Sequence, residues 1–368
     1  MIKYLGSKRT LITTLTQLIQ GLDRVHTVID LFSGTSRVGH ALKASGYRVR
    51  ANDHNAYAAT LARCYVQADA DEHQTDAERL IREFNQLPGR DGYFTETFCR
   101  QSRFFQPANG ARIDAIREAI AEKDLEPELE AIVLTSLLEA ADRVDSTTGV
   151  QMAYLKQWAP RAHKPLELRV PAILPRAGAG KGEAHMLDAL QAARCLEGDL
   201  TYLDPPYNQH KYLGNYHVWE TLVRWDAPEA YGTARKRVDC RERRSPFNSK
   251  PGCLPAFEQV VGELHSPYLL VSFSNEGFID REQMGRILSA RGHVTVLERP
   301  YRRYVGAQIG IHDPRGRKVG EVSHLHNRER IFLVSPEPVT LPELSDLLVE
   351  ESSPPARAGS FGATANPQ

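Results

Sequence analysis

The sequence predicts an α/β protein in which helices cover both faces of a central sheet, and three observations lead to this fold class. Short apolar runs near the N-terminus alternate with helical stretches, as in a strand-helix-strand unit. Further apolar runs of similar length return after residue 199. The 368 residues, of which 41% are hydrophobic and 25% charged, are enough for one large domain or two modest ones.

The predicted sheet is Rossmann-like, and its elements follow in order along the chain. The run VHTVIDLF (25–32) reads as a buried strand, and the glycine-containing turn after it leads into a helix. A second strand (47–53) and a second helical stretch (55–66) follow at once. Four later strands are predicted at 199–207, 268–275, 293–301 and 330–336.

A helix-rich block separates the early strands from the later ones. Within it, residues 117–144 carry apolar side chains at helical spacing. We therefore predict an inserted, mainly helical subdomain over 67–183, with 1–66 and 184–340 forming the sheet domain. Residues 352–368 are small, polar and rich in Pro and Gly, which predicts a disordered tail.

Composition excludes several classes of protein. Lys+Arg and Asp+Glu are equal at 46 each, so the chain as a whole lacks a basic signature for nucleic acid. Five scattered cysteines without CxxC spacing make a disulfide framework and a structural zinc site improbable. His312, His324 and His326 lack a carboxylate or cysteine at ligand spacing, so we expect no metal. With neither a membrane span nor a cleavable signal visible, we expect a cytoplasmic protein without a membrane partner.

The sharpest motif is Asp204-Pro205-Pro206-Tyr207, directly after the apolar strand LTYL. Two prolines stiffen the backbone at a strand end and leave carbonyl groups unpaired. A carboxylate before them and an aromatic ring after them suit a planar amine, with acceptors at its NH₂ group and a ring against its face. A plain proline turn that ends a strand is the alternative.

Two further signals lie at the ends of the first two strands. Gly34 and Gly39 in the turn DLFSGTSRVG allow the backbone to approach a ligand at a helix N-terminus. Asp53 ends the second strand about 20 residues later, where an acid typically binds ribose hydroxyls. Glycine-containing turns are common, however, and an isolated Asp is more often a helix N-cap.

The segments KYLGSK (3–8), DLFSGTSRVG (30–39), Asp53 and LDPPY (203–207), in that order, resemble the Dam-like class of DNA adenine-N6 methyltransferases (class alpha, with a DPPY motif). NYHVWETL (215–222), SPFNSK (245–250) and VSFSNEGF (271–278) resemble a subgroup of such enzymes. The resemblance implies a Rossmann-like methyltransferase sheet with an inserted target-recognition subdomain.

The resemblance also implies roles for individual residues. Lys8 would pair with the carboxylate region of S-adenosylmethionine, Asp53 would bind its ribose, and Asp188 would face its adenine amine unless it is a surface helix residue. The expected cofactor-binding residues are Tyr4, Lys8, Asp30, Phe32, Ser33, Gly34, Asp53 and Asp188. Asp204, Pro205, Pro206 and Tyr207 take the catalytic roles, with Tyr207 stacking on the target base.

The activity implied by the resemblance is methyl transfer from S-adenosylmethionine to the N6 amine of a flipped adenine in double-stranded DNA. Such an enzyme needs no metal, and it works alone or beside a cognate restriction endonuclease at the nucleoid. Two alternatives remain open from the sequence: an RNA adenine-N6 methyltransferase and a catalytically inactive DNA-binding module.

Basic clusters after the DPPY segment are the candidate DNA contacts. Residues 235–244 hold six basic and two acidic side chains, and 299–318 interleave basic residues with Tyr301 and Tyr304. The predicted contacts are Arg235, Lys236, Arg237, Arg243, Arg244, Lys250, Arg302 and Arg303. The aromatic- and amide-containing stretch 93–114 is a candidate for base recognition, although an apolar patch explains it almost as well.

Overall fold

A computed structural model describes residues 1–274, 277–302, 311–312, 318–320, 326–341 and 348–353. Arg303 and His324, named above, lie outside the described residues, and so does the predicted tail apart from Ser352 and Ser353. Only the backbone of Arg302 is described. Within the described part, no helix is both long and apolar enough to cross a membrane.

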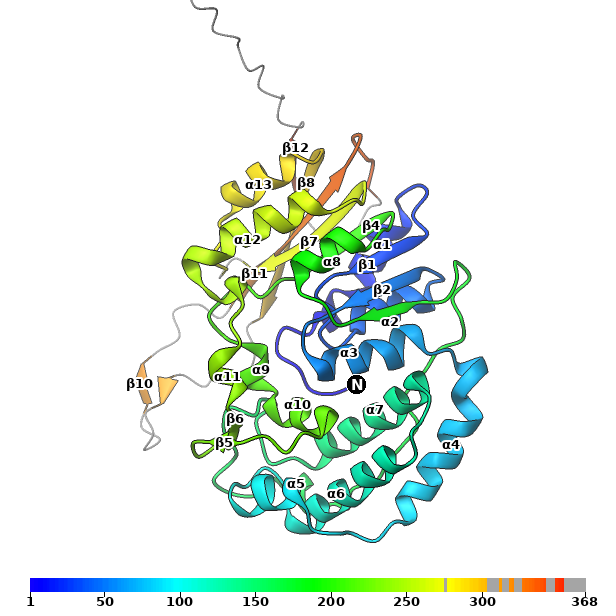
Figure 1. The fold of residues 1–368 in the computed structure, drawn as a ribbon. Helices are drawn as coiled ribbons and strands as arrows, with labels where there is room; N and C mark the ends of the chain where they lie inside the picture. Colours follow the sequence, from blue (N-terminus) through cyan, green and yellow to red (C-terminus); the bar gives the residue numbers. More distant parts are fainter. Residues whose placement is uncertain (275–276, 303–310, 313–317, 321–325, 342–347, 354–368) are drawn as a thin grey trace, which may run out of the picture.

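The centre of the molecule is a sheet of eight described strands (Figure 1). Its order from one edge to the other is β12 (Leu348–Ser353), β8 (His293–Arg302), β11 (His326–Ser335), β7 (Tyr268–Ser274), β4 (Leu200–Leu203), β1 (Thr27–Asp30), β2 (Arg48–Asn52) and β3 (Glu183–His185). The five strands from β7 to β3 pair in parallel, whereas β11, β8 and β12 pair antiparallel. The sheet is therefore mostly parallel where it carries the site.

All six strands predicted from apolar runs are confirmed, because the central strands of a sheet that is covered on both faces are rich in buried apolar residues. The predictions missed β3 and β12. The first is only three residues long, and its residues are half-buried at the sheet edge. Neither strand carries the continuous apolar run that marks a buried strand in a sequence.

Helices cover both faces of the sheet, as predicted. On one face, α1 (Ile12–Gln20) and α2 (Arg37–Ala44) share a hydrophobic cluster with β1, β2 and β4. On the other face, α8 (Ala189–Cys195), α12 (Lys250–Glu263) and α13 (Arg281–Ser289) pack on β1, β4 and β7. Alternate residues of one strand serve both clusters, since Val28 points to the first and Ile29 to the second.

A helical lobe lies beside the sheet (Figure 1). Its inserted helices are α4 (Ala70–Gln86), α5 (Tyr93–Thr95), α6 (Pro107–Glu122) and α7 (Pro127–Val144), with π-helical turns at Arg63–Gln67 and Glu96–Arg100 and a 3-10 turn at Pro160–His163. The predicted insertion is therefore mainly helical. Its hydrophobic core also includes α3 (Ala56–Ala62) and α10 (His217–Arg224), so the lobe extends beyond the predicted boundaries of 67–183.

Small elements complete the fold. The 3-10 turn η1 (Lys8–Thr10) precedes α1, and α9 (Tyr212–Asn215) follows the DPPY segment. The hairpin β5 (Ala230–Tyr231) and β6 (Lys236–Arg237) leads into α11 (Asp239–Glu242) and the 3-10 turn η5 (Pro246–Asn248). Strands β9 (Ile311–His312) and β10 (Lys318–Gly320) form a separate pair.

Candidate active site

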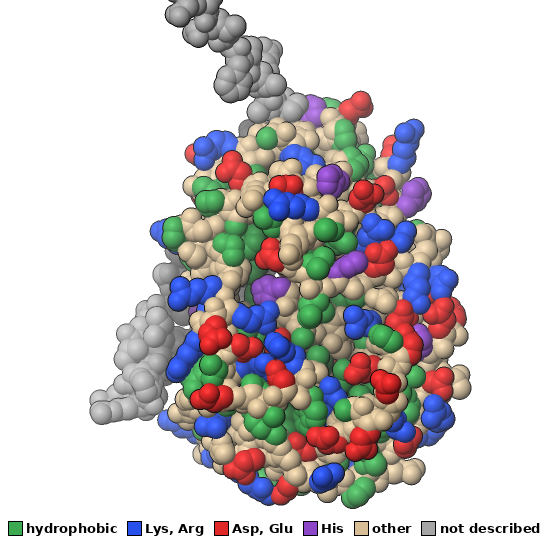
Figure 2. Space-filling view, in the orientation of Figure 1, with side chains coloured by type: hydrophobic (Ala, Val, Ile, Leu, Met, Phe, Trp, Pro, Cys, Tyr) green, Lys and Arg blue, Asp and Glu red, His purple; other side chains and the backbone are tan. Residues whose placement is uncertain are grey.

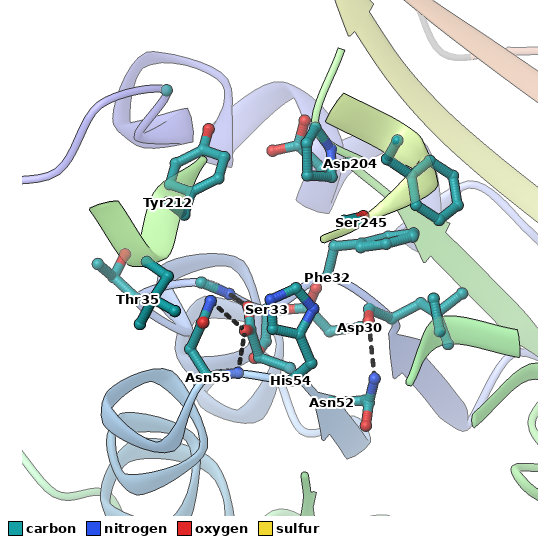
Figure 3. Close-up of a pocket in the computed structure, with 18 of the residues that line it drawn as sticks. Asp30, Phe32, Ser33, Thr35, Asn52, His54, Asn55, Asp204, Tyr212 and Ser245 are labelled. Carbon is teal, nitrogen blue, oxygen red and sulfur yellow. Dashed lines mark hydrogen bonds between the residues drawn. The ribbon is translucent and has the colours of Figure 1, made fainter. Parts of the chain in front are cut away.

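A cavity of about 400 Å³ opens where β1, β2 and β4 end at their carboxyl edges. Ligands bind at this edge in open α/β sheets, because the loops that follow the strands converge there. All eight predicted cofactor-binding residues line the cavity, and so do Asp204 and Pro206. In Figure 3, Asp204 and Tyr212 lie on one side of the cavity and Asn52, His54 and Asn55 on the other. The fold thus brings together motifs that are far apart in the sequence.

Asp30, the last residue of β1, points its carboxylate into a tight turn. The side chain is 1% exposed, and it accepts a backbone hydrogen bond from Gly39. Burial, together with the nearby Asp204, raises the pKa of Asp30 to about 7. A Cβ atom at Gly39 would lie 2.9 Å from Val66 and 3.4 Å from the Asp30 carboxylate, so glycine is needed for this close packing.

Asp53 ties the turn after β1 to the start of α3. Its Oδ2 accepts a hydrogen bond from the Gly34 backbone N–H at 3.1 Å, and its Oδ1 accepts from the Asn55 N–H at 2.9 Å. Gly34 has a φ of +52°, and a Cβ atom there would lie 3.2 Å from the Tyr4 ring. Asp53 therefore organises the loop and lines the cavity, whereas the N-cap of α3 is Asn55. Its binding to a ribose stays a prediction.

Tyr4 belongs to an aromatic stack at the cavity wall. Its ring lies between Tyr212 and Tyr216, with centroid separations of 5.2 and 4.6 Å and nearly parallel planes. Its hydroxyl lies 3.3 Å from that of Tyr57. The sequence analysis missed Tyr212, although the four-residue spacing from Tyr216 is a helical signal that both rings share a face.

Asp204 follows β4 and meets the N-terminal segment. Its Oδ1 lies 3.1 Å from the Lys8 Nζ, and the same ammonium contacts Glu329 on β11. Burial, with a further contribution from Glu329, outweighs Lys8 and raises the pKa of Asp204 to about 6. Burial alone would lower the pKa of Lys8, but the two carboxylates raise it well above its ordinary value. Asp204 is thus a half-buried carboxylate, 19% exposed, next to a fixed positive charge.

The other residues of the DPPY segment lie around Asp204. Pro206 lines the cavity, whereas Pro205 is buried behind it. The half-buried Tyr207 packs edge-on against Phe273 at 5.9 Å between centroids, and it is not among the residues that line the cavity. Its stacking on a target base therefore stays a prediction. Asn248 donates a hydrogen bond to the Asn208 carbonyl at 2.9 Å, which holds η5 over this segment.

Comparison with known proteins identifies the family. The sequence model of the D12 class N6 adenine-specific DNA methyltransferases matches residues 4–249, more than half of the chain and all the motifs that line the cavity. The chain belongs to this family. It is an adenine-specific DNA methyltransferase that uses S-adenosylmethionine as its methyl donor.

Several modification methyltransferases are similar to this chain. The Type II methyltransferase M.NlaIII of Neisseria lactamica is 31% identical, with 90% of this chain aligned to 100% of that protein. The Type II methyltransferase M.FokI of Planomicrobium okeanokoites is 30% identical over 82% of this chain, and the match covers only 50% of its length. The modification methylase LlaI of Lactococcus lactis is 27% identical over 82% of this chain and 51% of its own length. Neither the RNA methyltransferase nor the inactive-module alternative is supported by these relatives.

The lining of the cavity fits the cofactor of this methyltransferase. Several buried polar atoms there have no hydrogen-bond partner among the described residues, among them Ser7 Oγ, Ser33 Oγ and Asn55 Oδ1. Buried polar atoms are normally hydrogen-bonded, so these atoms indicate a polar ligand. Phe32 and Phe247, in edge-to-face contact at 5.2 Å, and Leu187 add an apolar surface suited to a purine ring.

The predicted DNA contacts differ in their surroundings. Arg243 and Arg244 line the cavity of the methyltransferase, and Arg244 and Lys250 are exposed. Arg243 Nη1 lies 3.3 Å from the buried Glu220, so part of its charge is compensated. Figure 2 shows Lys and Arg side chains mixed with Asp and Glu near the hollow over α9 to α11. Arg235 and Lys236 are half-buried in the hairpin region.

For Arg237 the prediction of a DNA contact is wrong. The residue is 2% exposed, and its guanidinium is hydrogen-bonded to Asp226 at 2.7 and 2.8 Å and to Asp239 at 3.1 Å. An arginine that is buried between two carboxylates has no charge left for a phosphate. It instead fixes the β5–β6 hairpin onto α10.

The base-recognition hypothesis for 93–114 is also corrected. Phe94, Phe98, Phe104 and Phe105 are at most 1% exposed and form part of the core of the helical lobe. Burying aromatic rings against one another removes their apolar surface from water and stabilises the fold. These phenylalanines are therefore explained by the apolar-patch alternative.

One cluster among the described residues has the geometry of metal ligands, formed by Glu72, His73 and Glu128. The ammonium of Lys181 lies 2.8 Å from Glu72 and 3.0 Å from Glu128, in the place where a cation would sit. The cluster is thus already neutralised by the protein. His312 lies in β9 and His326 in β11.

Proposed function

We propose that the chain is a site-specific methyltransferase that acts on a flipped adenine in double-stranded DNA, either in a Type II restriction-modification system or as a solitary methylase. One observation carries the proposal: the half-buried Asp204, at the end of β4, faces the same cavity as the predicted cofactor residues. The names of the Type II relatives support the link to restriction and modification.

The cofactor-binding assignment divides the cavity into a polar and an apolar part. Asp53 and the loop 33–35 would hold the ribose and the amino-acid end, and Asp188 and Leu187 would face the adenine. Asp188 is exposed and caps α8 through a hydrogen bond from the Leu190 N–H at 2.9 Å. When bound, S-adenosylmethionine supplies an activated methyl group on a sulfonium. The contact between Lys8 and the cofactor carboxylate stays a prediction, since its ammonium already pairs with Asp204 and Glu329.

Asp204 would accept a hydrogen bond from the target amine. A carboxylate acceptor draws the N6 proton away and leaves the lone pair more available for attack. The backbone carbonyl of Pro205 would accept the second N–H. The rings of Tyr207 and Tyr212 are the candidates for contact with the face of the adenine. The residues of the chain thus position the nucleophile, and no covalent enzyme intermediate is needed.

An adenine inside a duplex cannot reach Asp204, because the carboxylate lies at the bottom of a cavity. We therefore infer that the base leaves the helix, at a cost of a few kcal/mol. Arg244 and Lys250 at the exposed rim are the proposed phosphate contacts, with Arg235, Lys236 and Arg243 next to them. The helical lobe beside the cavity is the proposed target-recognition region, through side chains other than its buried aromatics.

The experiment is expression in a methylation-deficient bacterium, followed by single-molecule sequencing of its DNA. We expect methylated adenine at one recurring short motif, and none with Asp204→Ala. Methylated cytosine, or adenine methylation that persists with Asp204→Ala, would contradict the proposed site. The motif obtained also supplies the recognition sequence of the enzyme. A protein of this role would be found at the nucleoid.

A further inference from the structure

A second carboxylate holds the ammonium that contacts Asp204. Lys8 Nζ is in contact with Oε1 of Glu329 as well as with Oδ1 of Asp204. Both Lys8 and Glu329 are nearly inaccessible, with side chains that are 9% and 7% exposed. A buried charge persists only when it is paired. Glu329 is not in the segments that resemble the family, and it lies one residue before a strand predicted at 330–336.

Glu329 is itself fixed by the sheet. The Ser272 hydroxyl on β7 donates a hydrogen bond to Glu329 Oε1 at 2.6 Å. In the antiparallel ladder Glu329 is opposite Ser274, so Ser272, Ser274 and Glu329 share one face of the sheet. The contacts therefore run from β7 through β11 and η1 to the end of β4. Ser272 and Glu329 are buried, Lys8 and Asp204 are half-buried, and each of the four comes from a different part of the fold.

We propose that Glu329 is a positioning residue for methyl transfer: it anchors the Lys8 ammonium so that Lys8 contacts only one oxygen of Asp204, and Asp204 stays free to accept the adenine amine. This inference rests on the proposed role of Asp204. If the inference holds, a residue of β11, which lies outside the motifs, influences the proposed catalytic carboxylate Asp204 through Lys8.

Asp204 and Glu329 share the single ammonium group of Lys8. Lysine offers three N–H donors, and Glu329 uses one of them in a fixed direction. Without that anchor the flexible lysine side chain could centre on Asp204 and compete with the substrate amine for its oxygens. In the reaction the N6 lone pair would take the methyl group that the cofactor supplies, and N6 would give up one proton, which Asp204 would accept. Asp204 must therefore remain ionised and accessible.

The charges around Asp204 determine in which direction its pKa should move when one of them is removed. The groups facing it are Lys8 from η1, Glu329 from β11, Asp30 from β1, Tyr202 from β4 and Tyr212 from α9. Glu329 raises the pKa of Asp204 and Lys8 lowers it. Neutralising Glu329 should lower this pKa, whereas neutralising Lys8 should raise it.

The test is the pH profile of single-turnover DNA methylation by the full chain. With Glu329→Gln we expect the acid limb to move to lower pH by about one unit and the plateau rate to fall on the order of 10- to 100-fold. The affinity for S-adenosylmethionine should change by a smaller factor than the rate, as expected for a residue that acts on Asp204 through Lys8. Lys8→Met should move the acid limb to higher pH. An unshifted acid limb in Glu329→Gln would overturn the inference.

Two variants separate positioning from general damage. Glu298→Gln neutralises a carboxylate on the adjacent strand β8 that is 2% exposed and pairs with Arg330 at 2.6 Å, on the opposite face of the sheet. It should lower thermal stability without moving the acid limb, and a shift as large as that of Glu329→Gln would contradict our reading. Ser272→Ala keeps every charge but loosens Glu329, so it should slow transfer at unchanged cofactor affinity. If it leaves the rate unchanged, the positioning role is wrong even if Glu329→Gln does not fold.

Asp204→Ala distinguishes this inference from the proposed function. If that variant still methylates adenine, the role of Asp204 fails and the inference fails with it. If Asp204→Ala is inactive while the acid limb of Glu329→Gln does not move, only the role of Glu329 is refuted.

Discussion

The Nζ atom of Lys8 lies 3.1 Å from Oδ1 of Asp204, so the N-terminal motif and the DPPY motif meet in one ion pair. Almost 200 residues of chain separate the two. They meet because β4 lies at the centre of the sheet and because η1 passes its carboxyl edge. The pair explains why a lysine that precedes the first strand belongs to the same site as a carboxylate that follows a later one.

The pH dependence of methylation should follow Asp204. Its pKa is raised to about 6, and the ionised form is the acceptor for the amine, so the rate should fall as the pH drops through about 6. Single-turnover rates at saturating DNA and cofactor would show this limb. Asp204→Asn should be slower by on the order of 10² to 10⁴-fold and should lack the limb. A wild-type rate that stays constant down to about pH 5 would contradict the assignment.

Asp30→Asn should stabilise the protein at high pH only. The pKa of Asp30 is about 7 in the folded protein and 3.8 when the side chain is in water. The folded state therefore holds the proton more tightly, and the stability that comes from this is full below pH 3.8 and is lost as the pH rises through about 7. Near pH 8 the buried, ionised carboxylate costs on the order of 4 kcal/mol, and the neutral amide avoids this cost. Urea unfolding at about pH 4 and about pH 8 measures the difference.

The matched control is Asp188→Asn, which removes one negative charge from an exposed position of the same cavity. An equal gain for Asp30→Asn at both pH values would show that burial of its charge is not the cause. We also expect the Asp30 variant to bind the cofactor more weakly, because the substitution removes a carboxylate from the cavity lining.

Gly34→Ala should disturb the cofactor loop more than Gly46→Ala does. Both glycines have positive φ, +52° and +92°, so both alanines carry the same kind of backbone strain of about 1 kcal/mol. Only at Gly34 would the new Cβ atom meet the Tyr4 ring, at 3.2 Å, whereas nothing lies within 4 Å at Gly46. Cofactor affinity measured by calorimetry should fall for Gly34→Ala alone. Equal losses in both variants would argue against the Tyr4 contact.

Arg237→Ala and Arg244→Ala should have opposite phenotypes. Removing the buried Arg237 leaves Asp226 and Asp239 with the half-exposed Arg224 as their remaining cationic partner, which should cost about 3 kcal/mol of stability and leave the salt dependence of DNA binding unchanged. Removing the exposed Arg244 should leave stability unchanged and reduce the slope of log K against log salt by about 1. A reduced slope for Arg237→Ala at full stability would restore it as a DNA contact.

The six confirmed strands share one property: each contains a short run of apolar, β-branched or aromatic residues next to a turn signal, and such a run is visible in the sequence. Arg237 shows where such reasoning stops. Its place in a basic run suggests a phosphate contact, yet Asp226 and Asp239 approach it only after the β5–β6 hairpin has formed. The aromatic residues of 93–114 are a similar case, because the sequence does not distinguish a ring buried in a core from a ring at an interface.

The sequence by itself determined the α/β class, the positions of six strands along the chain and the motifs that follow the strand ends, because hydrophobic periodicity and strand-end motifs are local properties of the chain. Only the tertiary structure decided which charges pair. Glu329 lies on an antiparallel strand and Lys8 on a turn before the first helix, and no spacing relates them. Their contact, and with it the electrostatic surroundings of Asp204, depends on the registry of β7, β11 and β4 in the folded sheet.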